Sequence, residues 1–192
     1  MTLALALLLA LFQAPKPGTY ELPPIAQVQE RELVDPSGAR VSFPGLAPGQ
    51  VAVVAFIYRG CHEAQGCPAS LALLRELDRR LAADPARAAR VRLACVSFDP
   101  DNDTPARMAE LRDLMAPRSD WRFLVPDGAT ALAQVLGDFG QDVVDLGGGA
   151  KRHVMKVYLV DADHQVRNVY ASGFLYLDLV LADIDTLVPH VK

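Results

Sequence analysis

Two long apolar segments constrain the fold of this chain most strongly. VAVVAFIY spans residues 51–58 and is continuously apolar, and VRLACVSF spans residues 91–98 and is mostly apolar. Strands of this kind have both faces buried, as in the centre of a sheet that is covered on each side. Because helical segments alternate with these and other strands, we predict an α/β sandwich with a central mixed sheet flanked by helices.

The segment between the two strands has a helical pattern. Pro68 suits a first helical position, where its missing N–H would be unpaired in any case, and Pro85 ends the pattern. Leucines recur at helical spacing and arginines occupy the opposite face: Leu71, Leu74, Leu77 and Leu81 against Arg75, Arg79 and Arg80. We further expect a strand hairpin around a DPSG turn, a glycine-rich loop at 147–149, helices from residue 104, over 127–136 and over about 176–188, and strands over 121–125, 153–160 and 166–171.

The N-terminus begins with an apolar run over residues 3–12. A transmembrane helix needs about 20 residues, so this run is too short to span a bilayer, but its length suits the core of a signal peptide. We predict a signal peptide or short membrane anchor over residues 1–14, a linker over 15–27 and one domain over 28–192. This organisation indicates a periplasmic or otherwise exported protein, either free or tethered to the membrane.

Charge excludes one class of partner. The sequence has 19 basic and 23 acidic residues, a net charge of −4, and no long basic run. Nucleic-acid binding needs concentrated positive charge, so we expect none here.

Cys61 and Cys67 are the candidate chemical groups. They lie where the first buried strand gives way to a helix, and the free N–H groups at a helix start favour a thiolate at Cys67. Three interpretations remain open: a disulfide staple, a redox pair and a metal site. A staple closing so short a loop would add only about 2–3 kcal/mol, and a large core does not need it. Cys95 lies inside the second strand and is expected to be a buried, inert thiol.

Several motifs together resemble the Sco/SenC family. They are FIYRGC and CPASL around the cysteines, VSFDPDNDTPARM, and RHVMKVYLVDAD, and the resemblance extends over residues 28–188. It implies a thioredoxin-like fold outside the cytoplasm and one copper ion bound by two cysteines and a histidine. Matched residue by residue, those ligands are Cys61, Cys67 and His153. The family helps to build the dinuclear copper site of cytochrome c oxidase, which implies its copper-bearing subunit, or another cuproprotein, as the client.

The sequence departs from the family pattern near this site. Five residues separate the cysteines here, against three in the family, and the longer loop offers His62 and Glu63 as further ligands. The segment DPDNDTP resembles the family's DPERDTP and places Asp99 and Asp103 beside the metal as loop or capping residues, with tuning of the site as the alternative role for Asp99. His164 and His190 are expected to be exposed.

Three functions follow, in this order. Copper binding by Cys61, Cys67 and His153 comes first, because two soft thiolates and an imidazole suit copper. The second is thiol–disulfide exchange by Cys61 and Cys67 on a client of the metal site. The segment GGGAKRHVMKVYLV lacks the proline typical of such oxidoreductases, whereas the long intercysteine loop favours exchange over a tight metal site. A peroxidase of the same fold is a distant third.

Overall fold

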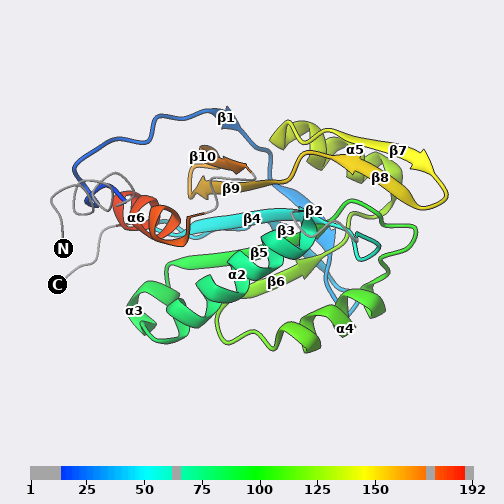
Figure 1. Cartoon of the computed structure of the whole chain (residues 1–192), viewed down its shortest axis with the longest axis horizontal. Helices are drawn as coiled ribbons and strands as arrows, with labels where there is room; N and C mark the ends of the chain where they lie inside the picture. The colour runs from blue at the N-terminus through cyan, green and yellow to red at the C-terminus, as the bar shows by residue number, and fades with distance from the viewer. Residues whose placement is uncertain (1–13, 62–65, 172–175, 189–192) are drawn as a thin grey trace, which may run out of the picture.

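The computed structural model describes residues 14–61, 66–171 and 176–188. Its centre is a mixed six-stranded sheet in the order β1-β10-β9-β4-β5-β6 (Figure 1). The strands are β1 (Ala26–Gln27), β4 (Val51–Ile57), β5 (Val91–Ser97), β6 (Trp121–Leu124), β9 (Lys156–Asp161) and β10 (Gln165–Ala171). The helices are α2 (Cys67–Ala82), α3 (Pro85–Ala88), α4 (Pro105–Met115), α5 (Gly128–Phe139) and α6 (Leu177–Leu187). The predicted α/β sandwich with a central mixed sheet is confirmed.

The two apolar segments form the middle of this sheet. β4 pairs in parallel with β5 and antiparallel with β9, and every residue of β4 and β5 is buried. Parallel neighbours require a crossover, which α2 provides. Because β4 and β5 run in the same direction, their carboxyl ends meet at one edge of the sheet.

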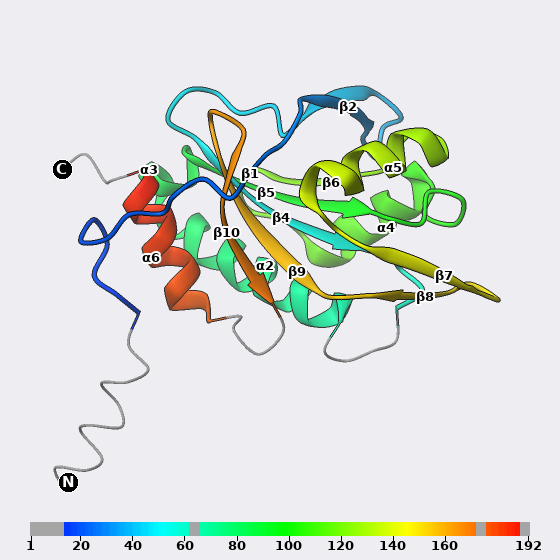
Figure 2. The same cartoon turned by 90° about the horizontal axis from the view of Figure 1, so that it is seen from above.

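Helices cover both faces of the sheet, with α5 in front of it and α2 behind it in Figure 2. Phe139 of α5 packs on Phe56 of β4 and Tyr158 of β9, with ring centroids 5.2 and 5.1 Å apart. The apolar face of α2 buries Leu73, Leu74, Leu77 and Leu81, whereas Leu71 is only half-buried. The predicted face of this helix is therefore rotated slightly toward Leu73.

A separate hairpin corrects the prediction for the region before β9. It consists of β7 (Val143–Gly147) and β8 (Ala150–His153), and it projects from the end of the molecule opposite α6 (Figures 1 and 2). His153 ends β8 instead of beginning the strand predicted over 153–160, which starts at Lys156. Gly147, Gly148 and Gly149 all have positive φ values, so they reverse the chain between two strands that carry little apolar alternation.

Two helix boundaries also differ from prediction. α5 continues through Gly137 to Phe139 and ends at Gly140, because Gly140 has the left-handed φ of 58° that terminates helices. Pro85 does not simply end α2: it begins α3, whose first turn is capped by the Asp84 carboxylate accepting from the Arg87 N–H. A proline at a first helical turn is as compatible with starting a helix as with ending one.

The segment before the predicted domain packs against it. The Tyr20 hydroxyl donates to Asp183 at 2.5 Å, Leu22 is buried, and the Ile25 N–H donates to the Val166 carbonyl at 2.8 Å. The predicted hairpin around the DPSG turn is confirmed as β2 (Arg31–Val34) and β3 (Arg40–Phe43). No helix within the described residues is long and apolar enough to cross a membrane.

Candidate metal centre

Cys61 lies in a tight turn at the carboxyl end of β4. The chain leaves the sheet at Tyr58, and the Cys61 N–H donates back to the Tyr58 carbonyl at 3.2 Å. Gly60 suits this turn, because a Cβ atom there would come within 3.2 Å of the Tyr58 ring. The turn leaves the Cys61 side chain buried, with 8% of the residue exposed.

Cys67 is the first residue of α2, with Gly66 as its N-cap. The sequence places Cys67 just before the helix, one residue from its position in the structure. Its sulfur accepts a hydrogen bond from the Tyr58 N–H at 3.4 Å, and the residue is 2% exposed. The end of β4 and the start of α2 therefore bring the two sulfur atoms within 4.8 Å of each other.

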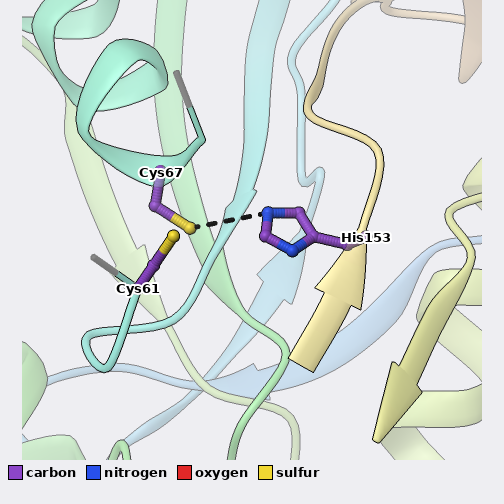
Figure 3. A group of neighbouring side chains, drawn as sticks. All are labelled: Cys61, Cys67 and His153. Carbon is purple, nitrogen blue, oxygen red and sulfur yellow. Dashed lines mark hydrogen bonds between the residues drawn. The ribbon is translucent and has the colours of Figure 1, made fainter. Parts of the chain in front are cut away.

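His153 approaches these thiols from the end of β8. Its Nε2 atom lies 3.8 Å from the Cys67 Sγ atom, and its ring faces both cysteines (Figure 3). The ring packs against Phe98, at a centroid separation of 4.8 Å, and against Tyr58, at 5.9 Å. The Nδ1 atom is buried and has no hydrogen-bond partner among the described residues.

The three side chains form a compact donor set. The Cys61 and Cys67 sulfurs and one nitrogen of His153 all lie within 4.8 Å of one another. Two sulfurs and an imidazole nitrogen this close together can hold a soft metal ion. The sequence analysis named these three residues, and the structure brings them together.

Burial governs the protonation of the cysteine pair. It raises the pKa of Cys67 well above the ordinary value, and the neighbouring Cys61 thiol raises it further, whereas the Tyr58 N–H opposes the change. The expectation that the helix start favours a thiolate is thus wrong for the metal-free protein, because loss of solvation outweighs the helix N–H groups. Without a metal, burial therefore disfavours the thiolate form of Cys67.

None of the described cysteines forms a disulfide, and all three are buried. The structure therefore shows two separate thiols at residues 61 and 67, with no staple between them. Cys95 is fully buried in β5, as predicted, and accepts a hydrogen bond from the Trp121 indole N–H at 3.3 Å. Burial raises its pKa to about 12, in keeping with an inert thiol.

The remaining predicted residues fall into three groups. His62, Glu63 and His190 lie outside the described residues. His164 is half-buried in the turn between β9 and β10, although it was expected to be exposed. Asp99 and Asp103 are buried in the loop before α4, with 5% and 1% exposed, and Thr104 is the N-cap of that helix.

Sequence reasoning missed the aromatic walls of the site. Tyr58 and Phe98 each follow directly after a central strand, β4 and β5, and their rings stand 5.0 Å apart. The signal was present, because aromatic residues at the carboxyl ends of adjacent parallel strands must lie close together. Both rings pack against the half-buried His153.

Fold and site together define a class of protein. The fold is a thioredoxin-like α/β sandwich, and its cysteine pair flanks the turn from a central strand into a helix, opposite a histidine. The profile of the SCO1/SenC family matches residues 24–188, and the chain belongs to this family. A search among curated proteins found no match to the sequence.

Solved structures of Sco proteins share the fold. A SCO1/SenC family lipoprotein from Bacillus anthracis has a TM-score of 0.76 at 20% identity, with 88% of this chain and 99% of that one covered. BsSco, a member of the Sco family of cytochrome c oxidase assembly proteins in which a disulfide switch was identified, has a TM-score of 0.74 at 23% identity, covering 89% and 99%. Copper-bound ScoI from Bradyrhizobium japonicum has a TM-score of 0.64 at 23% identity, covering 82% and 98%.

Proposed function

We propose that this protein binds copper and acts as a metallochaperone or assembly factor for the dinuclear copper site of cytochrome c oxidase. The observation that carries the proposal is the convergence of Cys61, Cys67 and His153 within 4.8 Å. Thiolates select soft ions such as Cu(I), and imidazole suits copper in either oxidation state. Support comes from the Sco proteins of Bradyrhizobium japonicum and Arabidopsis thaliana, which share the fold and contain copper.

Each residue of the site would have a distinct role in binding copper. Cys61 and Cys67 each release a proton and bind the ion through sulfur, and His153 supplies a nitrogen. The Tyr58 N–H stabilises the Cys67 thiolate, since its hydrogen bond to that sulfur strengthens when the sulfur is charged. Copper is the cargo, so delivery requires a client ligand to replace these donors one at a time.

The structure leaves space for such a ligand beside the cysteines. A cavity of about 230 Å³ is lined by both cysteines together with Leu71, Leu111 and Leu114. It lies between the first turn of α2 and the face of α4, and His153 is not among its lining residues. A client thiol entering here would meet the two sulfurs without first displacing the histidine.

A Cu(I) titration tests this function. Reduced protein lacking residues 1–14 would compete with a chromophoric chelator for Cu(I), beside Cys61→Ser, Cys67→Ser and His153→Ala. We expect one copper per chain, held more weakly by each variant. Failure of the unsubstituted protein to compete for copper would refute the proposal.

The alternative function is thiol–disulfide exchange. The free pair Cys61 and Cys67 favours it, as does the disulfide switch found in BsSco. In this step the two thiols lose two protons and two electrons and form an S–S bond. A client disulfide breaks, takes up both and becomes a dithiol. Turnover of a client disulfide by a protein that does not compete for copper would favour this alternative.

We also propose that residues 1–14 direct export and either leave as a signal peptide or remain as an anchor ahead of residues 15–27. The related protein from Bacillus anthracis is a lipoprotein, which supports the proposal of an anchor here. In this chain, Gly18 contacts Thr186 of α6, at the opposite end of the molecule from the β7–β8 hairpin (Figures 1 and 2). An anchored protein would thus present the metal centre away from its point of attachment. Fractionation and N-terminal sequencing of the expressed full-length chain test this proposal.

A further inference from the structure

The loop over residues 99–104, between β5 and α4, contacts the segment that carries Cys61. The Asp103 carboxylate accepts hydrogen bonds from the Ser97 hydroxyl at 2.7 Å and from the Arg59 N–H at 3.1 Å. Arg59 lies two residues before Cys61, within the turn that leaves β4. One end of the loop therefore fixes the backbone of the cysteine segment.

The other end of the same loop contacts the hairpin that carries His153. The Lys151 Nζ atom lies 3.4 Å from an Asp99 carboxylate oxygen, and only 12% and 6% of these side chains are exposed. Asp99 is held in turn by the Asn102 amide, which donates to both of its oxygens at 3.0 and 3.1 Å. An ion pair this far from water is stable only when its geometry is well supported, as Asn102 supports it here.

Strand geometry connects this ion pair to the metal centre. Alternate residues of a strand share a face, so Lys151 and His153 point to the same side of β8. Lys151 also pairs with Asp145 of β7 at 3.1 Å, which joins the two strands of the hairpin. The β7–β8 hairpin is a two-stranded sheet of its own, and an isolated hairpin is only marginally stable. Its orientation therefore depends on contacts with its surroundings.

We propose that Lys151 and Asp99 are positioning residues that hold the β7–β8 hairpin so that His153 faces Cys61 and Cys67. The 99–104 loop thereby sets the distance between the cysteines and His153. Asp103 holds the segment that carries Cys61, and Asp99 holds the hairpin that carries His153. This proposal rests on the proposed copper function, because it explains how one of the copper ligands is positioned. The position of His153 can nevertheless be measured without any metal.

Lys151→Met and Asp99→Asn each remove one charge of the pair with little change in size. Lys151→Arg retains the cation and is the conservative variant. Arg152→Met is the matched control, because it removes a cation from the next position of the same strand, where the side chain is exposed. Asp145→Asn removes the partner within the hairpin and leaves Asp99 in place.

The first measurement is NMR of the metal-free protein, with contacts between the His153 and Phe98 rings as the reporter. These contacts should be strong in the unsubstituted protein, Arg152→Met and Asp145→Asn, retained in Lys151→Arg, and lost in Lys151→Met and Asp99→Asn. The resonances of β4 and β5 show that each variant is folded. Ring contacts that persist in folded Lys151→Met and Asp99→Asn would overturn the proposal.

The second measurement is Cu(I) affinity by competition with a chelator. Loss of a group that orients a metal ligand weakens binding by about 10–100-fold, and we expect this loss in Lys151→Met but not in Arg152→Met. An unsubstituted protein that fails to bind copper would refute the proposed function alone, because the ring contacts would still decide the role of Lys151. Lost ring contacts with unchanged copper affinity would overturn the positioning role at the metal centre.

Discussion

The Nε2 atom of His153 lies 3.8 Å from the Sγ atom of Cys67, although 86 positions separate the two residues in the chain. The contact joins the start of α2 to the open end of the β7–β8 hairpin, where β8 ends opposite the start of β7. Neither element alone forms a donor set. The centre therefore exists only when the hairpin is docked, and its properties should respond to changes on either side.

Removing the imidazole should weaken copper binding without abolishing it. In His153→Ala the two sulfurs remain, so one copper should still bind, with an affinity at least about 100-fold lower, since changes in outer groups alone cost about 10–100-fold. Competition with a Cu(I) chelator measures the change. His164→Asn is the control, because His164 lies in the β9–β10 turn and asparagine tolerates its positive φ of 59°. Equal losses in both variants would contradict the assignment.

Copper affinity should rise with pH. Burial raises the pKa of Cys67 well above its ordinary value, so the free protein holds this proton near neutral pH and copper must displace it. Each displaced proton changes the apparent affinity by about tenfold per pH unit, so between about pH 7 and about pH 8.5 the affinity should rise at least tenfold per unit. A titration series corrected for the protonation of the chelator measures this slope. An affinity that does not change with pH would mean that Cys67 is already a thiolate in the free protein.

Cys95 should make the metal-free protein less stable in alkali. Burial raises its pKa from 9.0 to about 12, so the folded state disfavours the thiolate that the unfolded chain forms freely. Its contribution to stability is therefore complete below pH 9.0 and is lost as the pH rises toward 12. In that window it should lower the free energy of unfolding by about 1.4 kcal/mol per pH unit. Denaturant unfolding of the protein and of Cys95→Ala at several pH values tests this, and the variant should show the shallower decline.

The Tyr20 hydroxyl should hold the N-terminal segment on the domain. Asp183 is 1% exposed and accepts hydrogen bonds from Tyr20 at 2.5 Å, from Tyr170 at 2.6 Å and from Asn168 at 2.7 Å. Tyr20→Phe removes one donor from a buried carboxylate and should lower the free energy of unfolding by about 1–2 kcal/mol. Thermal or denaturant unfolding measures the loss. An unchanged stability would mean that the segment packs without help from this bond.

The central layers of the fold could be predicted because their signals are local. The continuous apolar character of β4 and β5 requires burial on both faces, and a proline near the start of α2 marks where the helix begins. The β7–β8 hairpin could not be predicted in this way. Its strands are mostly exposed and carry charged residues, so apolar alternation does not identify them, and the two-residue Gly148–Gly149 turn between them is the one local signal.

The donor set was also only partly predictable from local sequence patterns. Cys61 and Cys67 can be paired from their place between a strand and a helix, but His153 enters only through resemblance to the Sco/SenC family. No local pattern predicts its approach, because that depends on how the hairpin packs. The roles of Lys151 and Asp99 are further from prediction still, since an ion pair between a strand and a distant loop leaves no periodic signal in either segment.

X-ray absorption spectroscopy of the Cu(I)-loaded protein tests the central claim most directly, because it identifies the atoms bound to copper. We predict two sulfur atoms and one imidazole per copper in the unsubstituted protein, and loss of the imidazole signal in His153→Ala. A copper bound by sulfur alone in the unsubstituted protein, or an imidazole signal that survives in His153→Ala, would contradict the assignment of Cys61, Cys67 and His153 as the copper ligands.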